Sequence, residues 1–373
     1  MRRLSRRGCL FNAIPTGGAA AEPRSARGRL STDIAASDYI RRSACAVGGR
    51  RGHKEWEHFA ILAADVDLLV NFSCCDEQRP GAARGAELPR LVLLVRAGGW
   101  DGDVETFTMQ ESRVPAGRVD VRLGNNRLSL DDEGFEIHSV LRDRPVEVEL
   151  RLRPVTAPAF VPGIPMLDGP PLHWLVVPRL VVDAGRVRIG DRTYVLDGAL
   201  AYHDHNWGYF AWGHDVAWEW GFVLPDDPQV PWSVTFVRLT NRARTSALSH
   251  KVLVWRGEQL AYVFRESDVR AETALHYFRP PSIFKVPRPM ALVAPQSATD
   301  IPNAIDTRAA VGGDWIECAC RPEHLAQVLI PSEADLGVTI FNEVAARAAV
   351  RGCIAGESFD FKGKSILEFI RYV

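Results

Sequence analysis

The sequence contains no run of about 18 apolar residues, so we expect no transmembrane helix. It also lacks a C-x-x-C pair, a P-loop and a G-x-G-x-x-G segment after a strand, which removes the usual sequence evidence for zinc ribbons and nucleotide-binding folds. The 45 Lys and Arg residues are balanced by 46 Asp and Glu residues. Because no folded-looking segment carries a dense basic run, we expect no nucleic-acid partner.

Cysteines are few and odd in number, which argues against a framework of disulfides. The seven residues are Cys9, Cys45, Cys74, Cys75, Cys318, Cys320 and Cys353. Cys318 and Cys320 have the period-2 spacing of one face of a strand. Reduced, partly buried thiols suit a cytoplasmic protein, which is the location we expect.

Large apolar residues are scarce at the N-terminus. Residues 1–54 carry eleven Arg and one Lys against three acidic residues. A segment of this composition cannot bury enough surface to offset the loss of conformational entropy, so residues 1–52 are predicted to be a disordered, dispensable basic segment. A transit peptide and an over-long start assignment both fit this composition.

The rest of the chain is predicted to be all β. Short Val-, Leu- and Phe-rich segments alternate with turn residues every 8–12 positions, which is typical of a sandwich or barrel. Proline-rich residues 158–171 and 279–305 predict irregular connections. Residues 323–329 carry the one helix signal, and residues 345–350 favour a strand despite their alanine content.

Aromatic and titratable residues are crowded into one stretch. Five of the ten tryptophans lie between Trp207 and Trp232, and three of the ten histidines lie between His203 and His214. Indole faces can hold an apolar ligand or stabilise a developing cation, and an adjacent acid can supply a proton. The stretch therefore predicts an apolar pocket that contains an acid–base group.

Strand alternation divides this segment into two faces. His203, His205 and Trp207 share one face, and Asp204, Asn206 and Gly208 share the other. Two histidines offer two metal ligands, with His214 or Glu219 as further candidates, but no third ligand has a recognisable spacing, and we expect no metal. Histidines that are hydrogen-bonded in a core, and a core Trp-x-Trp pair, are the structural alternatives.

A second candidate opens the first strand. Glu55 and Glu57 share one face there, and Trp56 and His58 share the other. A buried carboxylate is costly unless it is paired, so one face is predicted to be polar or to line a cavity, the alternative being an edge strand with a solvated glutamate face. A third candidate, Glu368, is a lone acidic residue near the C-terminus.

These segments resemble one known family. The stretch Tyr202–Gly208 resembles the Asp-x-x-Trp-Gly motif of the carotenoid 1,2-hydratase (hydroxyneurosporene synthase) and AttH-like family. Glu55-Trp56 is similar to the family's opening strand, and the segment from Arg351 to Glu368 is similar to its last strands. The resemblance implies two lipocalin-like β-barrel domains with an apolar site near their junction. The strand pattern on both sides of Asp226-Asp227 divides them into residues 53–225 and 226–373, with few short helices.

The resemblance also implies chemistry. The family includes hydratases that add water to a terminal C=C bond of a carotenoid, and related two-domain proteins act as pericyclic cyclases. His205 and Trp207 match positions that matter to the hydratases, and Asp204 matches the motif aspartate. The hydratases carry a Tyr-Asp pair where this chain has Val237-Arg238, so another acid, Asp204, Glu219 or Glu55, would have to supply the proton.

We therefore expect a cofactor-independent enzyme that protonates a C=C bond of a long apolar polyene or terpenoid-like substrate, in the manner of a hydratase. A shape-directed cyclase of the Diels–Alderase type and a non-catalytic lipid or pigment carrier are the alternatives. An apolar substrate could bring the protein to a membrane surface, and the oligomeric state is left open.

The catalytic candidates are Asp204, His205, Trp207 and Glu219. The substrate-binding candidates are Trp56, His58, Tyr202, His203, Asn206, Trp212, Trp218 and Trp220. For both faces of the central strand to meet one cavity, the strand must bulge or end near residues 209–213.

Overall fold

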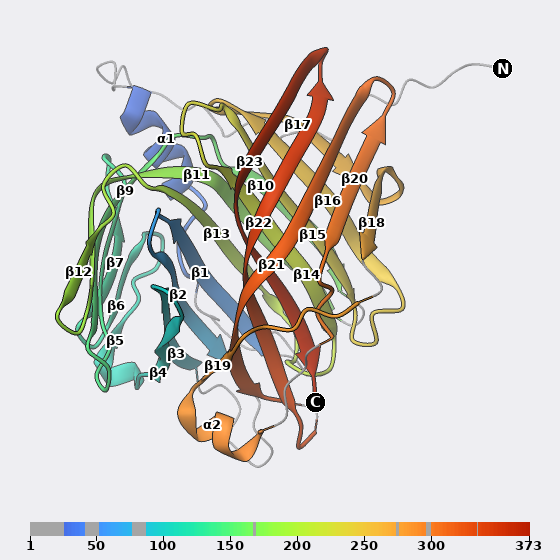
Figure 1. Cartoon of the computed structure of the whole chain (residues 1–373). Coiled ribbons are helices and arrows are strands. Elements are labelled where there is room, and N and C mark those ends of the chain that lie inside the picture. The colour runs from blue at the N-terminus through green and yellow to red at the C-terminus, as the bar shows by residue number, and fades with distance from the viewer. Residues whose placement is uncertain are drawn as a thin grey trace.

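The computed structural model describes residues 26–41, 52–76, 87–166, 169–273, 276–295, 300–333 and 335–373. Two curled sheets, almost entirely antiparallel, dominate this part of the chain and confirm the all-β, lipocalin-like prediction (Figure 1). Short helices are few, and within the described ranges none is long and apolar enough to cross a membrane.

The first sheet contains thirteen strands. Its main path runs β4-β3-β2-β1-β13-β11-β9-β8-β7-β6-β5, and β10 and β12 pair with β11. Its strands are β1 (His53–Leu62), β2 (Asp67–Asp76), β3 (Glu87–Arg96), β4 (Trp100–Thr106), β5 (Ser112–Arg113), β6 (Asp120–Leu123), β7 (Asn126–Leu130), β8 (Phe135–Val140), β9 (Val146–Pro154), β10 (Ala159–Met166), β11 (Gly169–Ile189), β12 (Arg192–Val195) and β13 (Leu200–Tyr209).

The second sheet contains ten strands in the order β17-β16-β15-β14-β23-β22-β21-β20-β18, with β19 added in parallel beside β21. Its strands are β14 (Val216–Pro225), β15 (Trp232–Asn241), β16 (Ala247–Arg256), β17 (Gln259–Arg265), β18 (Val269–Thr273), β19 (Ile283–Val286), β20 (Ile305–Val311), β21 (Asp314–Pro331), β22 (Val338–Ile354) and β23 (Glu357–Tyr372). The chain changes sheet between Tyr209 and Val216, ahead of the boundary expected after residue 225.

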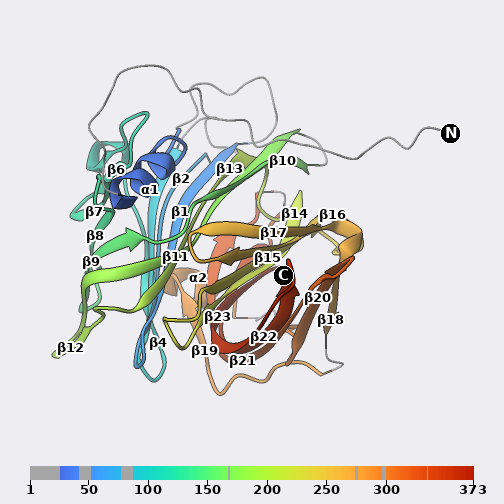
Figure 2. The same ribbon diagram turned by 90° about the horizontal axis from the view of Figure 1, so that it is seen from above.

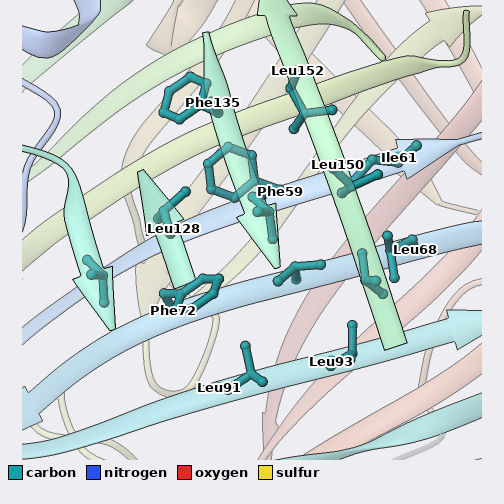
Figure 3. Packing of buried hydrophobic residues seen from close by; sticks show 14 of the residues in the cluster. Phe59, Ile61, Leu68, Phe72, Leu91, Leu93, Leu128, Phe135, Leu150 and Leu152 are labelled. Atoms are coloured by element: carbon teal, nitrogen blue, oxygen red, sulfur yellow. The ribbon is translucent and has the colours of Figure 1, made fainter. Parts of the chain in front are cut away.

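Three apolar cores explain why the central strands are buried on both faces. One core fills the interior of the first sheet and includes Phe59 and Phe135 (Figure 3). Another fills the second sheet around Phe264 and Val350. A third takes side chains from both sheets, including Trp218, and Figure 2 shows the two sheets lying against each other. Because β1 and β13 separate the first core from the third, each of their faces meets a different environment.

The prediction of disorder for residues 1–52 is wrong for residues 26–41. The helix α1 (Ala26–Ala35) and the residues after it pack on the first sheet, and Ile34 and Ile40 are completely buried in its core. The arginines in this segment hid the apolar spacing. Residues 1–25 and 42–51 lie outside the described residues.

Two local predictions are corrected. Residues 323–329 belong to β21 and not to a helix, because neighbouring residues such as Leu325 and Ala326 are buried in different cores and the strand alternation is hidden. Residues 159–166 form β10, whose register shifts where Pro162 and Pro165 lie, since an edge strand tolerates missing donors. The prediction of a strand at residues 345–350 is confirmed by β22. The second proline-rich stretch, residues 279–305, is not wholly irregular, because it contains the strand β19 and the helix α2 (Arg288–Val293).

Candidate active site

The strands β1 and β13 pair without a break in register, which decides how the motif is used. Trp56 lies opposite Asn206, Glu57 opposite His205, and His58 opposite Asp204. The predicted alternation of faces is therefore present. Neither a bulge nor an early strand end brings both faces to one cavity, so the two faces of the motif meet different sets of side chains.

The face of Asp204 and Asn206 lines a chamber of about 60 Å³ between the two sheets. A second chamber of about 80 Å³ adjoins it and shares part of its wall, including Trp56 and Glu368. We call these two spaces together the junction chamber. The residues around its first part are Trp56, His58, Asn71, Ile164, Leu172, Trp174, Asp204, Asn206, Trp218, Trp220, Val237, Leu239 and Glu368.

Asp204 is buried and its carboxyl is surrounded by donors. Its Oδ2 accepts hydrogen bonds from Trp174 Nε1 at 3.0 Å and from the Tyr202 hydroxyl at 2.9 Å, and Asn206 Nδ2 donates to its Oδ1 at 3.1 Å. Burial raises the pKa of Asp204 to about 7, and the donors from Trp174 and Tyr202 oppose this rise. The group can therefore hold or release a proton near neutral pH.

Two further carboxyls meet the junction chamber. Glu343 on β22 lies opposite Glu368 on β23, and Trp218 Nε1 donates to Glu368 Oε1. Burial raises the pKa of both carboxyls, that of Glu343 far above its usual range, which the charge of Glu368 increases further. Both shifts favour a proton held by the pair as a unit.

Aromatic rings form much of the remaining wall. The rings of Trp56 and Trp218 stack with centroids 5.9 Å apart. Tyr202 does not line the chamber but packs on Trp220, with the ring centroids 5.3 Å apart. His58 lies edge-on to Trp220 at 5.6 Å. Burial, with a smaller effect from His203, lowers the pKa of His58 to about 3, so its ring is neutral, and its Nε2 has no hydrogen-bond partner among the described residues.

The opposite face of the same strands holds a polar cluster, which we define as Asp38, Glu55, Glu57, His203 and His205. All five are completely buried within the first sheet. His203 Nε2 and His205 Nδ1 each lie 2.9 Å from an oxygen of Asp38. His205 Nε2 lies 2.9 Å from Glu55 Oε1. The edge-strand alternative for the glutamate face is therefore wrong.

Neighbouring charges shift the pKa values within this cluster. Although burial opposes it, the charges and hydrogen bonds of Glu57, Asp38 and Glu55 raise the pKa of His205 to about 10. Burial and the charge of Asp38 raise the pKa of Glu57 well above its usual range. His203 and His205 therefore belong to this interior cluster and not to the chamber.

The other catalytic candidates also lie away from the chamber. Trp207 lies on the same face of β13 as the polar cluster. Its ring stacks on His173 with the centroids 5.3 Å apart, and the Arg41 guanidinium lies 3.6 Å from its ring centroid. Glu219 points away from the chamber and lies 3.3 Å from Arg238 Nη1 and 3.5 Å from Arg371 Nη2.

Strand alternation also places Val237 and Arg238, the two residues that differ from the hydratase motif, on opposite faces of β15. Val237 lines the chamber, and Arg238 points to the face of Glu219. Of the remaining candidates, Trp212 lines the second part of the chamber. His214 is half-exposed, and its Nδ1 lies 2.8 Å from Asp215 Oδ1.

Sequence reasoning missed four residues that matter here. Trp174 and Asn71 gave no local signal of a shared site, because they lie about 100 residues apart in the sequence and only the packing of the sheet brings them to one chamber. Glu343 could have been found, since it is the only charged residue between Val338 and Ala346. Asp38 could not, because it lies in a segment whose composition indicates disorder.

Comparison with known proteins identifies the fold. No protein-family model and no curated sequence matches the chain. Among solved structures, a protein provisionally assigned as AttH from Nitrosomonas europaea is similar over 90% of this chain and 98% of its own, with a TM-score of 0.57 and 14% identity. Kievitone hydratase from Nectria haematococca matches over 86% and 89% of the two chains, with a TM-score of 0.56 and 11% identity. CghA with Sch210972 matches over 91% and 97%, with a TM-score of 0.50 and 13% identity. The chain therefore shares the lipocalin-like fold of these proteins.

Proposed function

We propose that the junction chamber is the active site of a cofactor-independent enzyme that protonates a C=C bond of an apolar, polyene- or terpenoid-like substrate. The observation that supports this most is Asp204, a buried carboxyl with a pKa of about 7 in a wall of aromatic rings. An acid with a pKa near the working pH transfers a proton most effectively. A carboxyl in such surroundings also has no evident role in packing.

In the proposed step, the O–H bond of Asp204 breaks and a C–H bond forms at one alkene carbon. The positive charge develops on the neighbouring carbon, where the faces of Trp56, Trp218 or Trp220 can each stabilise it by ~1–2 kcal/mol. The carboxylate that remains on Asp204 keeps its donors from Trp174 and Tyr202. The site therefore stabilises both charges that the proton transfer creates.

The fate of the cation determines the product. In a hydratase, water attacks the cation and returns a proton to the Asp204 carboxylate, so the net reaction adds one water. His58 lines the same chamber and is neutral, so its ring can orient that water. If water is excluded, a second alkene of the substrate attacks the cation and a ring forms, and the cyclised cation then loses a proton to the Asp204 carboxylate to give a neutral product.

The size of the chamber restricts how the substrate enters. The two parts hold about 60 and 80 Å³, far less than the ~300–1,000 Å³ of a site that encloses a drug-sized ligand. We therefore propose that only the reacting end of a long substrate enters between the sheets. The fold shared with kievitone hydratase and the resemblance of Tyr202–Gly208 to the carotenoid hydratase motif support the hydratase form of the proposal.

The proposal can be tested with the purified full chain and a panel of terminal polyenes and terpenoids in D₂O. A hydratase yields a product that has gained one water and one carbon-bound deuterium. A proton-initiated cyclase yields a ring-closed product with deuterium at carbon. A product without deuterium at carbon indicates a shape-directed cyclase, and an unchanged bound polyene indicates a carrier. Either of these last two results overturns proton transfer as the mechanism.

A further inference from the structure

The polar cluster on the other face of β13 has the atoms of a metal site. His205 Nδ1 and the carboxyls of Asp38 and Glu57 converge on one place inside the first sheet, and His203 Nε2 lies beside the other oxygens of the same two carboxyls. The Asp38 oxygens lie 2.9 Å from each of the two nitrogens, and the Glu57 oxygens lie 3.6 Å and 3.5 Å from them. Ligand atoms around a tetrahedral ion with bonds of ~2.0–2.1 Å are about 3.4 Å apart, so small shifts would seat an ion among them.

The second nitrogen of each of these two imidazole rings already has a polar partner. His203 Nδ1 lies 2.9 Å from the backbone oxygen of His58, and His205 Nε2 lies 2.9 Å from Glu55 Oε1. A metal-bound histidine typically donates its second N–H to a backbone carbonyl or a carboxylate in this way, which fixes the tautomer. An ion that displaces the second proton of each imidazole would then meet the lone pairs of the nitrogens that face Asp38 and Glu57.

Glu57 is the independent observation that points to a cation. Both of its carboxyl oxygens are completely buried, and neither has a hydrogen-bond donor within the described part of the chain. A buried carboxylate without a donor is strongly unfavourable. A divalent cation between the four side chains would give these two oxygens a partner.

The charges of the surroundings agree with this arrangement. Arg41 donates from its backbone N–H at 2.7 Å and from Nη1 at 3.1 Å to Glu55, so that carboxylate is already neutralised. His53 Nε2 is the other titratable group nearby, 3.6 Å from Glu55 Oε2. Once an ion displaces the proton of Glu57, the charges of Asp38 and Glu57 equal that of one divalent ion.

We propose that Asp38, Glu57, His203 and His205 bind one divalent transition metal of the zinc class in a closed, four-coordinate structural site. The N/O donor set suits Zn²⁺ or Co²⁺ and is too nitrogen-rich for Ca²⁺ or Mg²⁺. Sequence spacing pointed away from a metal because no third ligand lies at a recognisable spacing from His203 and His205. The third and fourth ligands come from β1 and from the segment after α1, and the ion would tie that segment to the sheet.

The test uses tag-free, full-length protein produced with zinc supplementation and dialysed against a weak chelator. We expect about one equivalent of bound metal, a fall of several degrees in Tm after removal with a strong chelator, and visible d–d absorption of tetrahedral Co²⁺ after reconstitution. Glu57→Gln preserves side-chain volume and should weaken Co²⁺ affinity at least ~10-fold. The matched control is His138→Ala in the less buried His138, Glu147 and Glu149 group, which should change neither stoichiometry nor spectrum.

Metal content well below one equivalent in the wild-type protein, no Co²⁺ bands and a Tm insensitive to chelation would overturn the proposal. The cluster would then be held by protons alone, with charged imidazoles and a protonated Glu57. Loss of the metal in His138→Ala and its retention in Glu57→Gln would also overturn it, because the ion would then sit at the surface group. None of these readouts depends on turnover, so the test is independent of the chemistry proposed for the junction chamber.

Discussion

Both faces of β13 bury polar groups, but the hydrogen-bond and charge partners of those groups differ between the two faces. On the face of His203 and His205, every ring nitrogen has a partner, and the segment after α1 closes the site. On the face of Asp204, burial outweighs the donors and leaves the carboxyl near its titration point. The comparison shows two roles for a buried polar group. Where hydrogen-bond and charge partners offset burial, the group holds neighbouring segments together. Where burial outweighs the partners, as at Asp204, the carboxyl keeps a proton that can be transferred.

The largest expected effect is on turnover. Asp204→Asn keeps the size of the side chain and an acceptor for Trp174 and Tyr202 but removes the acid, so turnover of a substrate found in the D₂O experiment should fall ~10²–10⁴-fold. Binding, measured by quenching of tryptophan fluorescence, should be retained. The matched control is Glu219→Gln on the far face of β14, which should turn over normally. Normal turnover in Asp204→Asn would transfer the role to Glu343 or Glu368, each testable as the glutamine variant.

The next effect is on stability and concerns the other face of β13. Asp38→Ala leaves His203 Nε2 and His205 Nδ1 facing an empty space, and breaking such a buried network should cost ~3–5 kcal/mol in the free energy of unfolding. Urea denaturation at constant m-value measures the change. Asp33→Ala, in the same segment but partly exposed, should change stability by less than about 0.5 kcal/mol. Equal effects for the two variants would show that residues 26–41 do not hold the cluster.

The pH dependence of turnover and of stability tests the role of the Asp204 face of β13. Because protonated Asp204 is the proposed donor, turnover should fall as pH rises through about 7, its pKa in the folded protein. The same shift has a stability cost. The folded state keeps a proton that the unfolded chain releases above pH 3.8, so stability present below that pH is lost as pH rises to about 7. Wild type and Asp204→Asn should therefore diverge in chemical denaturation between pH 4 and 8, the variant losing less stability. Parallel curves would contradict the raised pKa.

The smallest effect compares two tryptophans. Trp218→Phe removes a wall of the chamber and the donor to Glu368, and the loss of about 1–2 kcal/mol of cation stabilisation should lower kcat/KM roughly tenfold. Trp207→Phe should leave kcat/KM nearly unchanged, because that ring lies on the opposite face with Arg41. Steady-state kinetics on both variants checks the contrast. An equal loss in the two would mean that the substrate reaches both faces of β13.

The sequence by itself determined the all-β class, the alternating faces of residues 203–208 and the concentration of indoles beside an acid. These follow from local periodicity, which any strand of this pattern carries. Only the tertiary structure decided what each face meets. The partner of β13 is β1, about 150 residues earlier in the chain, and the carboxyls that complete the two sites come from a segment before the first strand and from the last two strands. Such pairings depend on sheet order and register, which are set by packing between residues far apart in the chain, so no local pattern could indicate that Asp204 and His205 serve different sites.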